Sequence, residues 1–251
     1  MPQTKAVLLV HLYGWVREME RWMTFCKKAT IHLLEDCAEA HGAVWARQHA
    51  GVFGAWGAFS FYPTKNLGAK GDAGALVTNS AEIASRVKTL QNYGANKRYE
   101  HLETGLNNRL HELHAAILST RLNWLEQFNA RRREIAQRYF AEIRNRRIQL
   151  LSAPITVTSE NSKPSPHDGH ASRRRSPAAS HVYHLFVVRC AERNRLAHFL
   201  KEHGIKTSIH YPLLAHHQNF LEKRPLRSAR SSKRRISCRT LSFSSMPSAA
   251  S

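Results

Sequence analysis

The stretch that decides how this chain folds is Ser60-Phe61-Tyr62-Pro63-Thr64-Lys65-Asn66-Leu67-Gly68. It begins inside a short apolar run, Phe59 to Tyr62, that is typical of a buried strand, and a Gly-rich turn separates it from a second strand candidate at Ala75 to Thr78. Lys65 has aromatic and small neighbours and no acidic residue before Asp72. Burial disfavours the charged ammonium, and Schiff-base chemistry requires the neutral amine. A single lysine is more often a surface residue, so Lys65 alone does not define a function.

Further strands are predicted on the N-terminal side of this stretch. Residues Ala6 to Val10 form one short apolar run, and a second run, Ile31 to Leu34, ends at Glu35-Asp36. A helix-like stretch from Met19 to Lys28 lies between them. Alternating strands and helices predict an α/β fold with a mixed, mostly parallel sheet. Ligands bind at the carboxyl ends of such strands, so Asp36 is a candidate ligand contact, with a helix N-cap or a surface carboxylate as the alternative.

The C-terminal half predicts a second, smaller α/β domain. A helical pattern runs from about 111 to 146, with an apolar stripe expected to serve packing: Leu113, Ile117, Leu118, Leu122, Leu125 and Phe128. A strand over 182–188, a helix over 192–203 and a strand over 205–209 follow. We therefore predict a large domain over 1–125 and a small domain over 126–220. Residues 157–180 and 221–251 have the composition of a disordered insert and a disordered basic tail.

The net charge of +20 is concentrated in a few places rather than spread over the chain. Arg173-Arg174-Arg175 and the tail after Glu222 carry much of it. Nonspecific, salt-dependent nucleic-acid binding by the tail is an alternative, but the tail offers only Phe243 for stacking, so we do not expect a nucleic-acid partner.

The cysteines and histidines do not predict a metal site. The four cysteines form no C-x-x-C pair, which favours reduced thiols in a cytoplasmic protein. His181 and His184 would point to opposite faces of a strand, and we expect them to be structural or solvated. No apolar run approaches the ~18 residues of a membrane span, and no signal peptide is recognisable, so membrane association is not expected.

Five segments in this order and spacing resemble one protein family. They are Glu35-Asp36-Cys37-Ala38-Glu39-Ala40-His41-Gly42-Ala43, then residues 57–68 around Lys65, Leu90-Gln91-Asn92-Tyr93-Gly94, Gly105-Leu106-Asn107-Asn108-Arg109-Leu110 with 112–118, and Gly204-Ile205-Lys206-Thr207-Ser208-Ile209-His210-Tyr211-Pro212. Together they resemble the DegT/DnrJ/EryC1/StrS aminotransferases. Members use pyridoxal 5′-phosphate to transfer an amino group, usually from glutamate, to a keto group on a nucleotide-linked deoxysugar for polysaccharide or antibiotic synthesis.

The resemblance implies a fold of the aspartate-aminotransferase type (fold type I) and a role for each matching residue. Lys65 would carry the cofactor and later act as general base and acid. Asp36 would pair with the pyridine nitrogen. Glu39 would lie near the 3-oxygen, where the family often has Gln. Ser60 would bind the phosphate through its hydroxyl.

Three further residues gain roles from the resemblance. Asn107 would reach the cofactor phosphate of a neighbouring subunit, which implies a homodimer. His210 and Tyr211 would lie on the substrate side. A related group of sugar dehydratases replaces the cofactor lysine with His, and Lys65 argues against that activity.

The chain also departs from the family pattern. The family's N-terminal part, which supplies a phosphate-binding turn and an aromatic residue stacked on the pyridoxal ring, has no counterpart before Lys5, and the Arg/Ser-rich tail replaces the usual ending. We expect an N-terminally truncated large domain whose apolar surface is exposed. An inactive family fragment is therefore the alternative to an active aminotransferase.

Overall fold

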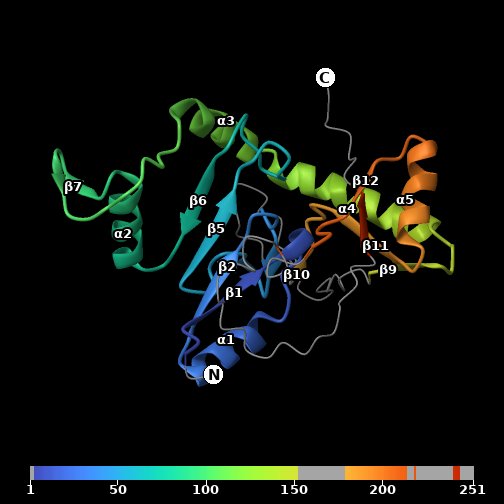
Figure 1. Cartoon of the computed structure of the whole chain (residues 1–251), viewed down its shortest axis with the longest axis horizontal. Coiled ribbons are helices and arrows are strands. Elements are labelled where there is room, and N and C mark those ends of the chain that lie inside the picture. Colours follow the sequence, from blue (N-terminus) through green and yellow to red (C-terminus); the bar gives the residue numbers. More distant parts are fainter. Residues whose placement is uncertain (1–2, 152–178, 214–217, 219–239, 244–251) are drawn as a thin grey trace, which may run out of the picture. The chain divides into compact units, whose positions relative to one another are not determined.

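A computed structural model describes residues 3–151, 179–213, 218 and 240–243 (Figure 1). Contacts divide the chain into two compact units. One comprises Met1–Ala136 and Pro154–His184, and the other comprises Gln137–Ala153 and Leu185–Ser251. The predicted boundary at residue 125 falls at the start of helix α4 (Leu125–Glu142), which contributes residues to both units.

The first unit is built on a four-stranded sheet in the order β1 (Ala6–Val10), β2 (His32–Asp36), β5 (Trp56–Ser60) and β6 (Gly74–Val77) (Figure 1). The first three strands are parallel, and β6 runs antiparallel to β5. A parallel pair needs a long crossover, which α1 (Met19–Ala29) provides between β1 and β2. The prediction of a mixed, mostly parallel sheet is confirmed.

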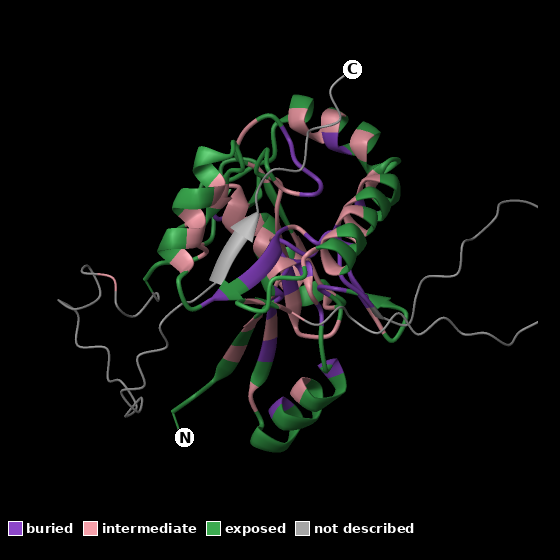
Figure 2. Cartoon of the chain, turned by 90° about the vertical axis from the view of Figure 1, so that its right-hand side faces the viewer, coloured by how far each residue is buried: buried purple, intermediate pink, exposed green. Residues whose placement is uncertain are grey.

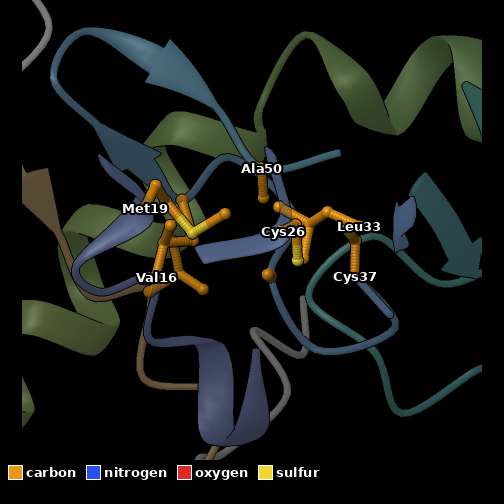
Figure 3. Close-up of a cluster of buried hydrophobic side chains, with 9 residues drawn as sticks. Val16, Met19, Cys26, Leu33, Cys37 and Ala50 are labelled. Carbon is orange, nitrogen blue, oxygen red and sulfur yellow. The ribbon is translucent and has the colours of Figure 1, made fainter. Parts of the chain in front are cut away.

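One face of this sheet packs on the main core. Figure 3 shows the buried cluster, which consists of Val16, Met19, Cys26, Leu33, Cys37, Ala40, Ala43, Ala50 and Val182. Met19 and Cys26 come from α1, and Leu33 comes from β2. Helix α1 ends where Thr30 adopts a left-handed backbone (φ 54°) and its N–H donates to the carbonyls of the last turn. Burial of α1 against the sheet thus defines the core side of the unit.

The opposite face of β1 is exposed. Leu8 and Val10 are 56% and 46% exposed, and along β1 only exposed and intermediate residues occur (Figure 2). The parallel register pairs Leu8 with Leu34 and Val10 with Asp36, so Asp36 belongs to the same face. The expected exposure of apolar surface is therefore observed on the face that carries Asp36.

A small second sheet stands beside the core in the order β10 (Ala179–Ser180), β3 (Val44–Trp45) and β4 (Gln48–His49). The Val44 N–H donates to Ser180 Oγ at 3.0 Å. The prediction that 157–180 is disordered is wrong for these last two residues, because this pairing orders them. Residues 157–178 lie outside the described part of the chain.

The helical prediction for 111–146 is confirmed as α3 (Glu112–Leu122) followed by α4. Leu118 is buried with Leu67 and Ala69, but Leu113 and Leu122 are 62% and 55% exposed. The predicted packing role of Leu113 and Leu122 is wrong. The face of α3 that is buried around Leu118 is narrower than the apolar stripe in its sequence. Before α3, Ser80 caps α2 (Ala81–Gln91), which leads into a hairpin of β7 (Ala95–Lys97) and β8 (Glu100–His101).

The second unit contains a sheet in the order β12 (Thr207–Ser208), β13 (Thr240–Phe243), β11 (Phe186–Cys190) and β9 (Ile148–Leu150), with helix α5 (Arg193–Glu202). The helix predicted over 192–203 and the strand predicted over 205–209 are present with shorter bounds, whereas the strand predicted over 182–188 is shifted to 186–190. The prediction of disorder over 221–251 is wrong for β13, which pairs with β11 and β12. Residues 221–239 and 244–251 lie outside the described part of the chain.

Candidate active site

The candidate site is built from the loops at the carboxyl ends of β1, β2 and β5. Backbone hydrogen bonds hold these ends together, from His11 N–H to Asp36 O at 3.0 Å and from Cys37 N–H to Ala58 O at 2.8 Å. Asp36 pairs in register with Ala58, and Ser60 lies two residues further along β5. Because side chains alternate along a strand, Asp36 and Ser60 project from the same face of neighbouring strands.

Lys65 lies in the loop between β5 and β6. Its N–H donates to Tyr62 O at 2.9 Å, and the Ala69 N–H donates to Phe61 O at 2.7 Å, so the loop is closed on itself. A Cβ at Gly68 would lie 2.5 Å from Pro63 O, which only glycine avoids. The Lys65 side chain is only 16% exposed. The loop therefore holds the amine in a fixed, mostly buried position.

Glu39 is the carboxylate beside Lys65. Its Oε1 lies 3.8 Å from Lys65 Nζ, and its Oε2 accepts a hydrogen bond from the Tyr13 N–H at 2.5 Å. Tyr13 belongs to a short 3-10 helix, Leu12–Gly14, that follows β1. The Glu39 side chain is 8% exposed. A backbone donor on one oxygen thus directs the other oxygen towards the lysine.

Sequence reasoning missed a buried polar network behind this pair. Asn66 Nδ2 donates to Asn129 Oδ1 at 2.8 Å and to Val182 O at 3.0 Å, while Asn66 Oδ1 lies 3.0 Å from His184 Nδ1. His184 Nε2 lies 3.8 Å from Glu39 Oε1. These residues are far apart in sequence, so no local pattern predicts the network. One sequence feature pointed to it, the polar residue Asn129 on the buried side of α4.

The residues of this site carry the kinds of chemical group that bind pyridoxal phosphate. The cofactor needs an amine for its aldehyde, a carboxylate for its pyridine nitrogen and donors for its phosphate. Lys65 and Asp36 supply the first two groups. Ser60 Oγ accepts from the Tyr62 N–H at 3.3 Å, which leaves the hydroxyl proton available to an anion. One carboxylate oxygen of the half-buried Asp36 accepts a hydrogen bond from the Ala38 N–H at 3.0 Å. The second oxygen is the one that would face the pyridine nitrogen.

The other three predicted site residues are Asn107, His210 and Tyr211. Asn107 is exposed, forms a bridge with Asn92 and accepts a hydrogen bond from Arg109 at 3.3 Å. His210 and Tyr211 belong to the second unit, where His210 is half-buried and Tyr211 is 56% exposed. Their roles stay predictions.

A second titratable cluster, His11, Glu35 and Cys37, lies in the core and has side-chain ligand atoms within 4.8 Å of one another. Glu35 accepts hydrogen bonds from His11 Nε2 at 2.9 Å and from the N–H groups of Gly51, Phe53 and Gly54 at 2.9, 2.7 and 2.8 Å. Burial alone would raise the pKa of Glu35, but these hydrogen bonds outweigh it and lower the pKa. Burial also raises the pKa of the Cys37 thiol. These four donors hold the Glu35 carboxylate in place, so we interpret Glu35 as a structural residue.

Among the described residues, no helix combines the length and apolarity needed to cross a bilayer.

Comparisons with known proteins identify the family of the chain. The model of the DegT/DnrJ/EryC1/StrS aminotransferase family matches residues 1–250. The chain is 45% identical over 216 residues to dTDP-3-amino-3,6-dideoxy-alpha-D-galactopyranose transaminase of Aneurinibacillus thermoaerophilus, which covers 86% of this chain and 53% of that protein. It is 37% identical over 215 residues to dTDP-3-amino-3,4,6-trideoxy-alpha-D-glucose transaminase of Streptomyces venezuelae, with coverage of 86% and 51%. The chain thus spans about half the length of these curated relatives.

Solved structures give the same result. The crystal structure of S. venezuelae DesV in complex with a ketimine intermediate superposes with a TM-score of 0.81 at 34% identity, over 97% of this chain and 60% of that chain. Bacillus subtilis NtdA with bound cofactor PMP shares the fold, with a TM-score of 0.74 at 24% identity, over 97% of this chain and 52% of that chain. The predicted fold type is confirmed, and the chain belongs to the DegT/DnrJ/EryC1/StrS aminotransferase family.

Proposed function

We propose that this chain supplies the cofactor lysine of a pyridoxal-phosphate-dependent aminotransferase acting on a nucleotide-linked keto-deoxysugar, with glutamate as the amino donor. The observation that carries the proposal is the mostly buried Lys65 amine, in the loop that follows β5 and 3.8 Å from Glu39. The relatives named above are transaminases of dTDP-linked amino sugars. The chain spans about half of their length. We therefore propose cofactor binding for this chain, and the complete reaction for a family member with the length of these relatives.

The residues of the chain have distinct tasks in this proposal. Lys65 Nζ would hold the cofactor through its aldehyde carbon, which requires the neutral amine, and the free amine would move a proton to and from the substrate carbon. Asp36 holds a proton on the pyridine nitrogen, and Ser60 donates its hydroxyl proton to the phosphate. When bound, the cofactor supplies an electron sink for the carbon that loses the proton.

The remaining parts of the proposal concern partners. Glu39 lies beside Lys65 and would face the 3-oxygen of the cofactor. Asn107 is exposed on the segment after the β7–β8 hairpin, which suits contact with a second copy in a homodimer. His210 and Tyr211 would contact the sugar substrate.

Capture of the cofactor by the purified full chain tests the proposal. We expect addition of pyridoxal 5′-phosphate to produce the visible absorbance band of a lysine-bound cofactor, and we expect Lys65→Ala to remove it. Lys70→Ala, a change of an exposed lysine in the same loop, is the matched control and should retain the band. A band of equal size in Lys65→Ala, or no band in the unaltered chain, would reject Lys65 as the cofactor lysine.

A further inference from the structure

His184 is a buried residue of the site to which no role has been given. Its side chain is 8% exposed, and it lies in the first unit together with Glu39, Lys65 and Asn66. Its two ring nitrogens face different groups. Nδ1 lies 3.0 Å from Asn66 Oδ1, and Nε2 lies 3.8 Å from Glu39 Oε1. The protonation of each nitrogen can therefore be inferred from its partner.

The orientation of the Asn66 amide fixes the state of Nδ1. Both contacts of Asn66 Nδ2 are with acceptors, Asn129 Oδ1 and Val182 O, so the nitrogen of this amide points there and its oxygen points to His184. The Asn129 amide is fixed in turn, because its Nδ2 donates to His41 O at 2.9 Å. An amide oxygen can only accept, so His184 Nδ1 carries a hydrogen.

The carboxylate of Glu39 then decides the state of Nε2. With a hydrogen on Nδ1, a neutral ring would direct an Nε2 lone pair at the negatively charged Oε1, whereas a protonated ring directs an N–H at it. Lys65 Nζ lies at the same 3.8 Å from the same oxygen. One carboxylate oxygen thus stands between two bases, and a buried carboxylate balances the charge of one cation.

We propose that His184 is a positioning residue of this site: held by Asn66, it pairs as a cation with Glu39 and so leaves Lys65 as the neutral amine. The proposal rests on the proposed function in one respect, that Lys65 reacts with the cofactor aldehyde. Without His184, the Glu39 carboxylate would stabilise the Lys65 ammonium, which cannot attack an aldehyde. His184 acts through Glu39 and needs no contact with the cofactor.

The other charged groups near this pair do not replace His184. Burial lowers the pKa of His41 to about 4, so His41 is neutral at neutral pH. Arg132 of α4 donates to the carbonyl oxygens of Tyr183 and His184, both at 3.2 Å. Asp36 is an acidic residue and cannot supply a positive charge to Glu39.

A set of four full-length proteins tests the proposal: the unaltered chain, His184→Gln, Glu39→Gln and the double variant. The rate of pyridoxal 5′-phosphate uptake at neutral pH is followed by visible absorbance. When Glu39 is present, we expect His184→Gln to slow uptake about tenfold. A change of one pKa unit lowers the fraction of neutral amine by about this factor. In the Glu39→Gln background the same change should have no effect, because no carboxylate remains to hold the ammonium. Equal slowing in both backgrounds would show a merely structural role and overturn the proposal.

Histidine NMR separates this proposal from the proposed function. Two-bond hydrogen–nitrogen spectra, with the His184 signals assigned by their loss in His184→Gln, report which ring nitrogens are protonated. At neutral pH we expect both His184 nitrogens to be protonated in the unaltered chain and only Nδ1 in Glu39→Gln. A deprotonated Nδ1, or an Nε2 that keeps its proton in Glu39→Gln, would contradict the proposal. If the unaltered chain takes up no cofactor, the proposed function fails while this spectrum still decides the state of His184.

Discussion

Glu35→Ala is expected to lower the free energy of unfolding by about 3 to 5 kcal/mol, the cost of removing one partner from a buried ionic network. Glu35 is fully buried and accepts hydrogen bonds from His11 and from three backbone N–H groups of residues 51–54. Alanine would leave these donors without an acceptor and away from water. Since domains are stable by only about 5 to 15 kcal/mol, this loss is a large fraction of the total stability.

Urea unfolding followed by circular dichroism measures this loss. Glu18→Ala is the matched control, because Glu18 pairs with Arg21 at 3.1 Å in an exposed bridge and should contribute about 0 to 1 kcal/mol. A Glu35→Ala chain as stable as the Glu18→Ala chain would show that the core carboxylate does not anchor the strand ends.

Acidification is expected to destabilise the chain between about pH 6.5 and pH 4 through His41 and His181. Burial lowers the pKa of His41 to about 4 and that of His181 to about 3, from an ordinary value of 6.5. His181 Nδ1 also accepts the Tyr183 N–H at 2.9 Å, a bond that protonation would break. In this window the unfolded chain binds more protons than the folded chain, so stability falls as the pH falls.

The expected slope is about 1.4 kcal/mol per pH unit for each buried histidine, or roughly 5 kcal/mol for the pair over two units. Urea unfolding at a series of pH values measures it. His41→Leu should remove about half of the slope, and substitution of the exposed His198 is the control. A slope unchanged by His41→Leu would show that His41 is not held neutral in the folded chain.

The sheet was predictable because local patterns determine it. Strand β1 was predicted with its observed bounds, β2 was predicted over 31–34 and is observed over 32–36, and β5 was predicted over 59–62 and is observed over 56–60. The carboxyl ends of β2 and β5 follow from parallel pairing, which brings Asp36 and Ser60 to one edge. Strand β13 was not predictable, because its partner β11 lies far away in a different part of the sequence.

The chemistry around Lys65 was only partly predictable. Glu39 is near Lys65 because both lie in loops at the same edge of the sheet, as the strand order implies. His184 and Asn66 meet because the backbone after β10 stays in the first unit, where the Val182 N–H donates to Gly14 O at 3.0 Å. Such a contact between distant segments leaves no local pattern. A carboxylate inside an apolar strand, Glu35, was a signal that went unused.

The central claim is that Lys65 is the residue that binds the cofactor, and one measurement tests it most directly. The full chain is incubated with pyridoxal 5′-phosphate, reduced with borohydride to make the lysine bond permanent, digested and mapped by mass spectrometry. The account predicts one dominant phosphopyridoxyl group, on the peptide that contains Lys65. Labelling spread over the exposed lysines, with Lys65 unmodified, would contradict it.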